Sequence, residues 1–137
     1  MNLIDNDLLS YDKWNETKKD LVRKKEIIYF REREIYWANI GENIGFEQNG
    51  KGNDFTRPLL IFKKFSKYIF CGIPLSTKKK NGSFFFTFNF KDNQISTALL
   101  VQSRTYDVKR LDKKMGKISV DDFERLKLAF KQLMDLD

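Results

Sequence analysis

The sequence predicts a mainly β protein with flanking helices (an α+β fold), in which a small, strongly bent β-barrel is preceded by a helical arm and followed by a C-terminal helix. Three observations predict this arrangement. Apolar residues repeat at helical spacing near both ends of the chain. Short β-type runs separated by tight turns occupy the middle. The 137 residues, 41% hydrophobic and 15% aromatic, suffice for one domain with a filled core.

The first element is a helix predicted over residues 7–25. Its apolar stripe, at about 100° per residue, consists of Ile4, Leu8, Tyr11, Trp14, Leu21 and Val22. The opposite face carries both signs of charge, unlike a helix that lies on a membrane, so we expect the stripe to pack on the core or on a second subunit. A charged block, residues 31–34, follows. We therefore divide the chain into an arm, residues 1–34, and a barrel domain, residues 35–137.

Five β-type runs follow the arm, and a helix closes the chain. The runs cover residues 35–40, 57–64, 67–74, 84–90 and 95–102, with a long loop at 41–56 and a hairpin turn at Phe65-Ser66. In the fourth run alternate residues are Phe, which predicts one buried face composed of Phe84, Phe86, Phe88 and Phe90. The closing helix is predicted from a cap formed by Ser119 and Asp122. Its apolar stripe is Phe123, Leu126, Phe130, Leu133 and Met134.

Composition narrows the classes of function. A net charge of +7 favours a polyanionic partner, most simply nucleic acid. The chain has no histidine, so its chemistry must proceed without imidazole, and its single cysteine, Cys71, excludes a disulfide framework and a zinc cluster. We therefore expect no metal and no other cofactor. No apolar run approaches the roughly 20 residues that cross a bilayer, and residues 1–5 lack the layout of a signal peptide. A cytoplasmic protein is expected.

Polar groups suited to phosphodiester chemistry stand at the ends of predicted strands: Glu47 and Gln48, Arg57, and Ser76 and Thr77. A planar guanidinium matches phosphate oxygens, which makes Arg57 the best-placed cation. Ser76 or Thr77 would hold another phosphate oxygen, and Glu47 would orient Arg57 or accept a proton from a ribose 2′-hydroxyl. Each group also has a purely structural interpretation, in which Arg57 pairs with Glu47 and the hydroxyls cap a strand end.

Further residues are candidates for RNA contacts, and they are Gln48, Lys51, Lys78, Lys79, Lys80 and Arg104. The three consecutive lysines are typical of a loop that follows a phosphate backbone. Such a charge run is more often a solvated turn, and that alternative stays open. Residues 102–111 are expected to support the fold, with Asp107 and Arg110 as a local ion pair and Arg104 as a secondary phosphate contact.

Taken in chain order, these segments resemble the MazF/PemK family of bacterial toxins, which are sequence-specific endoribonucleases. The matching segments are Trp37–Ile40, Gly45 with Glu47-Gln48, Arg57-Pro58 with Leu59–Ile61, Pro74–Thr77, Gln102–Asp107, Arg110-Leu111 and Gly116–Ile118. Several motifs in order are more specific than any one of them. The resemblance covers residues 35–137. It implies an SH3-like barrel, a homodimer with an RNA groove at or near the dimer interface, a small cognate antitoxin, and catalytic roles for Arg57, Glu47 and a hydroxyl of Ser76 or Thr77.

Two features depart from the usual pattern of the family. Ser76 stands where the family usually has threonine, and Thr77 follows it, so either residue could supply the hydroxyl. The loop over residues 49–56 is longer than in the short members of the family. A longer loop would reshape the RNA groove and change which bases are accepted.

The leading hypothesis is the toxin of a type II toxin–antitoxin system, which cleaves single-stranded RNA (an mRNA interferase) at a short sequence without a metal. Cleavage would proceed by attack of the 2′-hydroxyl on the adjacent phosphate. Together with its antitoxin, such a toxin would bind DNA. The alternatives are a non-catalytic nucleic-acid-binding module on the same fold and a gyrase-poisoning toxin of the CcdB type. The CcdB type acts through a C-terminal Trp-Gly-Ile end, which residues 133–137 do not resemble.

Overall fold

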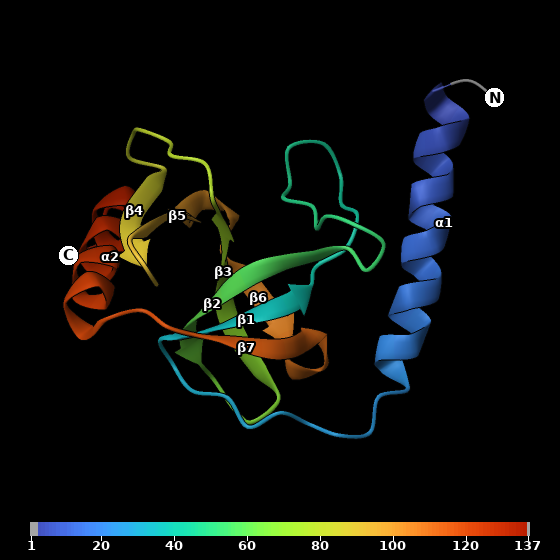
Figure 1. Ribbon diagram of the computed structural model, residues 1–137, viewed down its shortest axis with the longest axis horizontal. Helices are drawn as coiled ribbons and strands as arrows, with labels where there is room; N and C mark the ends of the chain where they lie inside the picture. The colour runs from blue at the N-terminus through green and yellow to red at the C-terminus, as the bar shows by residue number, and fades with distance from the viewer. Residues whose placement is uncertain (1–2, 137) are drawn as a thin grey trace.

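The computed structural model describes residues 3–136, which form one seven-stranded antiparallel sheet and two α-helices (Figure 1). The elements are α1 (Leu3–Val22), β1 (Glu34–Asn39), β2 (Thr56–Lys64), β3 (Ile69–Ser76), β4 (Phe85–Phe90), β5 (Gln94–Leu99), β6 (Arg104–Asp107), β7 (Leu111–Lys117) and α2 (Val120–Leu133). Two short 3₁₀ turns, η1 (Leu100–Gln102) and η2 (Val108–Arg110), flank β6.

Strand β3 is where the sheet bends. Along one edge it pairs with β2, and along the other it pairs with β6 at its start and with β5 at its end. The sheet, with the strand order β4-β5-β3-β2-β1-β7, therefore bends at β3 (Figure 1). Its outermost strands, β4 and β7, are not paired with each other within residues 3–136. The predicted fold class is confirmed, as a mostly β sheet with two helices, and the sheet is bent but not closed.

The sheet buries apolar residues on both faces because alternate residues of a strand point to opposite sides. In β2, Leu59 and Ile61 belong to one core cluster, whereas Leu60 belongs to a second. Phe88 and Leu126 are further members of the second cluster, which α2 covers beside β4 (Figure 1).

The predicted caps and stripes are confirmed in part. Ser119 Oγ accepts the Asp122 N–H at 3.1 Å and begins α2. Phe123 is buried, but Met134 lies past the end of the helix and is exposed, so the stripe ends one residue earlier than predicted. In the phenylalanine run only Phe88 is fully buried.

Strands β6 and β7 lie where no strand was predicted. Both are mostly polar and have one buried residue each, Tyr106 in β6 and Leu111 in β7, so they lack the alternation of apolar residues that identifies a strand. The predicted ion pair between Asp107 and Arg110 is wrong. Asp107 Oδ1 accepts the Lys109 N–H at 2.8 Å, and Arg110 Nη1 donates to the Asn39 carbonyl at 3.1 Å, because unsatisfied backbone groups compete for both side chains.

Helix α1 lies beside the sheet and is joined to β1 by an extended segment (Figure 1). Of its predicted stripe only Trp14 is buried, at 6% exposure, whereas Leu8, Tyr11 and Val22 are exposed. The side chain of Ile4 lies outside the described residues. Within α1, Trp14 is therefore the main buried contact, while the end of the helix is tied to η2, where the Val22 carbonyl accepts Lys109 Nζ at 3.0 Å. Neither of the helices within residues 3–136 is both long and apolar enough to span a membrane.

Glu34 joins three segments at the start of β1. Its carboxylate accepts the Arg31 N–H at 2.6 Å and the Tyr36 hydroxyl at 3.1 Å, and it pairs with Lys114 Nζ of β7 at 2.5 Å. Burial by itself would raise the pKa of Glu34, but hydrogen bonds from the three partners outweigh it and lower that pKa below its ordinary value of 4.5. Burial, with the nearby carboxylate, raises the pKa of Tyr36 to about 12.

Replacing this carboxylate should weaken the fold in a pH-dependent way. A lowered pKa means that the stabilisation by Glu34 is present above pH 4.5 and is lost as the pH falls through the folded-state value. Glu34→Gln is therefore expected to reduce the free energy of unfolding by about 1–2 kcal/mol near neutral pH, and by less in acid. Urea unfolding of the two proteins at both pH values measures this. Glu124→Gln, at an exposed pair with Lys127, is the control. A loss that is equal at both pH values would contradict the assignment.

Candidate active site

The pairing of β2 with β3 brings together residues that are far apart in the sequence. The two strands are antiparallel, with Leu59 opposite Pro74, so the start of β2 lies beside the end of β3. Arg57 is the second residue of β2, and Ser76 is the last residue of β3. The 40–55 loop, which connects β1 to β2, lies next to both. Three separate segments therefore meet at one end of the sheet.

Arg57 is the central residue of this region. Its side chain is only 8% exposed. Nε donates to the Asn49 carbonyl at 3.0 Å, and Nη1 donates to the Leu75 carbonyl at 3.1 Å. No carboxylate among the described residues forms an ion pair with it, and within those residues Nη2 has no hydrogen-bond partner. Burial lowers the pKa of Arg57, because removal from water disfavours its charged form. The guanidinium is fixed in place without being neutralised.

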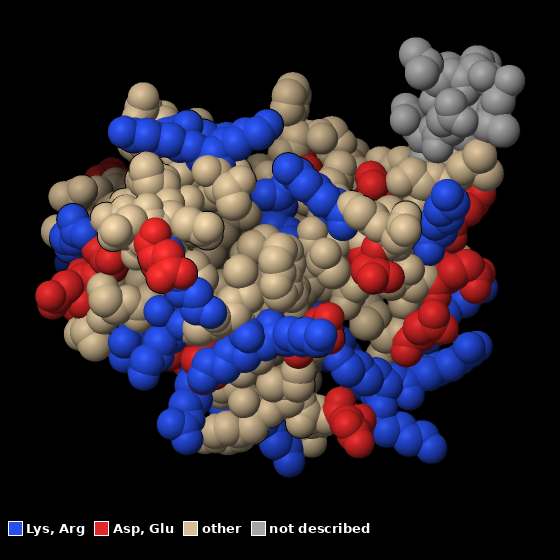
Figure 2. All heavy atoms as spheres, in the orientation of Figure 1, with Lys and Arg blue, Asp and Glu red and all other residues tan. Residues whose placement is uncertain are grey.

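Arg57 faces a cavity of about 540 Å³, which we call the Arg57 cavity. Its polar lining includes Lys51, Arg57, Ser76, Thr77, Lys91 and Gln94, and its apolar lining includes Trp37 and Phe90. No acidic residue of the described chain lines it. Lys and Arg side chains are also spread widely over the face shown in Figure 2. The cavity is suited to an anion, with aromatic surface beside it.

The two candidate hydroxyls both line the Arg57 cavity, but they are held differently. Ser76 Oγ accepts the Lys78 N–H at 3.2 Å, which fixes its direction and leaves its own hydrogen free to donate. Thr77 is exposed, and no described residue forms a hydrogen bond with its hydroxyl. Ser76 is therefore the better oriented of the two.

The structure does not bring Glu47 to Arg57. Glu47 is exposed, and its Oε1 accepts the Ile44 N–H at 3.1 Å. With Gln48 and Arg104 it lines a second cavity of about 490 Å³, the Arg104 cavity. The Gln48 N–H donates to Gln102 Oε1 at 3.0 Å, which ties this part of the loop to η1. The predicted site residues thus divide between two cavities.

The basic residues predicted to contact RNA lie in different places on the protein. Lys51 lines the Arg57 cavity and pairs with Thr56 through its backbone. Lys78, Lys79 and Lys80 follow β3 in an exposed turn and line neither cavity, and Lys80 Nζ lies 5.4 Å from the centre of the Phe85 ring.

Several residues of the site were missed in the sequence, among them Lys91, Gln94 and Asn49. Lys91 lines the Arg57 cavity from the turn between β4 and β5, where residues 91–93 all have positive φ. The Lys-Asp-Asn run between two strand patterns is a turn signal that could have identified it. Asn49 contacts Arg57 through its backbone carbonyl, and such a contact leaves no signal in the sequence.

Comparison with known proteins places this chain in a family. Residues 31–134 match the family described as the PemK-like, MazF-like toxin of type II toxin–antitoxin systems. A search of curated proteins returned no match.

Several solved structures have the same fold. The Mycobacterium tuberculosis toxin MazF-mt6 is similar at 20% identity and a TM-score of 0.60, over 77% of this chain and 99% of that one. MazF from Deinococcus radiodurans is similar at 15% identity and 0.62, over 82% and 100%. An endoribonuclease in complex with its cognate antitoxin, from a mycobacterial species, is similar at 12% identity and 0.60, over 77% and 95%.

The family match covers most of the chain, and the fold agrees with it. The protein belongs to the PemK-like, MazF-like toxins of type II toxin–antitoxin systems.

Proposed function

We propose that the protein is a sequence-specific endoribonuclease that cleaves single-stranded RNA without a metal. The observation that carries the proposal is the Arg57 cavity: an ion-pair-free guanidinium, two hydroxyls and two further ammonium groups line one opening, with no acidic residue of the described chain among them. Such a set binds a phosphate and stabilises the charge that develops on it. Solved neighbours named as endoribonucleases support the same activity.

In the proposed reaction, the ribose 2′-hydroxyl attacks the adjacent phosphorus and the bond to the 5′-oxygen breaks. Arg57 and Ser76 hold the phosphoryl oxygens and align the attack. The attacking hydroxyl loses its proton to water in the open cavity. Lys51 or Lys91 donates a proton to the departing 5′-oxygen. The products are a cyclic phosphate and a free 5′-hydroxyl. The substrate is single-stranded, because only splayed nucleotides reach the in-line geometry.

The Arg104 cavity is proposed to bind RNA that flanks the cleaved linkage. Gln48 and Arg104 supply an amide and a cation there. Glu47 was predicted to orient Arg57 or to accept the proton of the 2′-hydroxyl, and its position in this second cavity supports a contact with a flanking nucleotide instead. Lys78, Lys79 and Lys80 would add long-range attraction for the RNA backbone.

The proposed partners follow from the family. A small cognate antitoxin is proposed, as in the solved toxin–antitoxin complexes with this fold. A homodimer with an SH3-like barrel in each subunit, DNA binding by the toxin–antitoxin complex and a cytoplasmic location are further proposals. We also propose that residues 1–34 are an arm added to the barrel domain at 35–137, since the family match begins only at residue 31; Phe30 anchors the end of this arm in the core of the sheet.

Arg57→Lys should abolish most of the activity while keeping the charge. An ammonium group cannot make the planar two-point contact with a phosphate, so kcat is expected to fall by about 100- to 1000-fold. Cleavage of a long single-stranded RNA in excess chelator measures this effect. Arg33→Lys is the matched control, because Arg33 also donates to a backbone carbonyl, that of Ile118, and does not line the cavity. Equal cleavage rates for the two variants would contradict the proposal. If the unmodified protein binds RNA but does not cleave it, the result would favour a non-catalytic binder.

The two hydroxyls should differ in importance. Ser76→Ala removes the oriented donor and is expected to lower kcat by about 100-fold. Thr77→Val, which keeps the shape of the side chain, is expected to lower it by less than about 10-fold. Single-turnover cleavage of a short labelled RNA compares the two variants directly. The reverse order would show that Thr77 supplies the active hydroxyl.

A further inference from the structure

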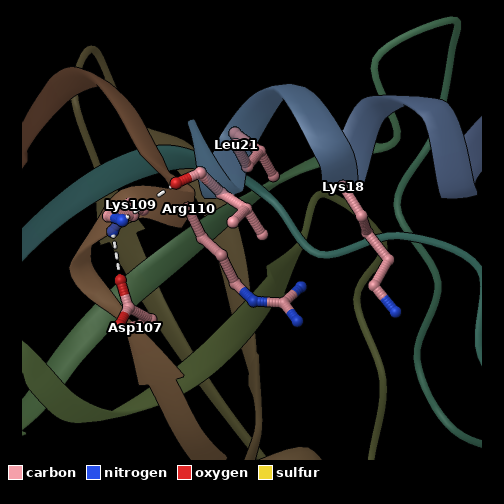
Figure 3. Close-up of a pocket in the computed structure, with 6 residues that line it drawn as sticks. Lys18, Leu21, Asp107, Lys109 and Arg110 are labelled. Atoms are coloured by element: carbon pink, nitrogen blue, oxygen red, sulfur yellow. Dashed lines mark hydrogen bonds between the residues drawn. The ribbon is translucent and has the colours of Figure 1, made fainter. Parts of the chain in front are cut away.

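Trp14 is the point at which helix α1 contacts the rest of the protein most closely. Its indole packs against Phe55, with ring centres 5.5 Å apart, and Arg110 lies 5.7 Å from the indole centre. Elsewhere the helix is less closely packed. Figure 3 shows Lys18 and Leu21 of its C-terminal half beside Arg110, where they line a cavity of about 270 Å³ between α1 and η2; next to it the Val22 carbonyl accepts Lys109 Nζ at 3.0 Å.

The backbone opposite Trp14 is shaped to receive it. Gly41 has a φ of +88°, a backbone angle that residues other than glycine rarely adopt. A Cβ atom at Gly41 would overlap the indole ring of Trp14. Gly41 is also the first residue after Ile40 in the 40–55 loop, so the contact is made at the base of that loop. Tyr11, one turn earlier in α1, donates its hydroxyl to the Asn43 carbonyl at 2.6 Å.

From Gly41 the contacts lead to Arg57. The Gly41 carbonyl accepts the Gly50 N–H at 2.8 Å. Asn43, which Tyr11 contacts, donates its own N–H to Asn49 Oδ1 at 2.6 Å. The Asn49 carbonyl in turn accepts Arg57 Nε. The Tyr11 contact is therefore linked through hydrogen bonds to Asn49, which holds the guanidinium, and the Trp14 contact is linked to Gly50, the next residue in the chain.

The 40–55 loop needs such support. It contains four glycines, at positions 41, 45, 50 and 52, and glycine loses the most conformational freedom when it is ordered. Ile44 and Phe46 in its middle are exposed, at 79% and 101%, so the tip of the loop adds little buried area of its own. Contacts at Gly41 and Asn43 reduce the number of conformations that the loop can adopt.

We propose that α1 is a clamp for the 40–55 loop and that Trp14 and Tyr11 are positioning residues for Arg57. This inference depends on the proposed function where it concerns catalysis. The family match begins at residue 31, so α1 lies outside the matched region. The clamp therefore depends on a segment that the family match does not include. Through it, a segment remote in sequence sets how rigidly the cation is held.

The test uses four variants of the full chain: Trp14→Ala, Trp14→Phe, Tyr11→Phe and Leu8→Ala. Leu8 lies on the same helix, is 57% exposed and serves as the matched control. Hydrogen exchange is followed at residues 42–53 and, as an internal reference, in β3. Cleavage of single-stranded RNA gives kcat and KM, and reaction with phenylglyoxal, followed by mass spectrometry, reports the accessibility of Arg57.

Trp14→Ala should accelerate exchange in the loop by about 10-fold or more without changing β3. It should lower kcat by about 10- to 100-fold, because small displacements of a catalytic group have effects of that size. KM should change little, and phenylglyoxal should modify Arg57 faster. Trp14→Phe should recover most of the loss, and Leu8→Ala should match the unmodified protein. Tyr11→Phe, which removes a single hydrogen bond, should act in the same direction but more weakly, and it replaces Trp14→Ala as the test if that variant fails to fold.

Unchanged exchange and unchanged labelling in folded Trp14→Ala would overturn the clamp. Faster exchange with an unaltered kcat would overturn the positioning role. An unmodified protein that cuts no RNA would disprove the proposed function instead. In that case the exchange and labelling results alone would decide whether α1 clamps the loop.

Discussion

The candidate site depends on how Arg57 is held: two backbone carbonyls fix the guanidinium, and no carboxylate of the described chain neutralises it. A neutral acceptor orients a cation without cancelling its charge, so the full attraction for an incoming anion is retained. Glu34 and Lys114 show the other solution in the same protein, where two charges are paired and serve to join β1 to β7. Burial without an ion pair costs free energy, and that cost is characteristic of functional positions rather than of structural ones.

The bend of the sheet creates the space in front of Arg57. Because β3 pairs with β2 on one edge and with β5 at its end, the β4–β5 hairpin forms a second wall opposite the start of β2. Lys91 and Gln94 line the cavity from that hairpin, whereas Lys51 lines it from the 40–55 loop. A flat sheet of the same strands would leave Arg57 on an open surface. The fold therefore contributes the site geometry as well as the stability.

Much of this could be predicted from the sequence, and the failures have physical causes. Strands with apolar runs, such as residues 57–64, were found because a strand that is buried on both faces is apolar at consecutive positions. Strands β6 and β7 were missed because backbone pairing, which leaves no pattern in side chains, holds mostly polar segments in the sheet. The apolar stripe of α1 suggested a broad packed face, but Trp14 is the one buried residue among the described members of that stripe.

The candidate site, like the fold, could be predicted from the sequence in part. The order of the motifs put Arg57, Ser76 and Thr77 near strand ends, and in the structure all three line one cavity. Glu47 was predicted to act beside them, but the conformation of the 40–55 loop directs it to the Arg104 cavity. That conformation is determined by backbone hydrogen bonds and by contacts with α1, neither of which short motifs encode.

The most direct test of the account is a crystal structure with a single-stranded RNA in which a 2′-deoxy nucleotide prevents cleavage. The account predicts that the phosphate next to this nucleotide lies within hydrogen-bond distance of the free edge of the Arg57 guanidinium and of the Ser76 hydroxyl. An RNA bound only in the Arg104 cavity, with no phosphate beside Arg57, would contradict it.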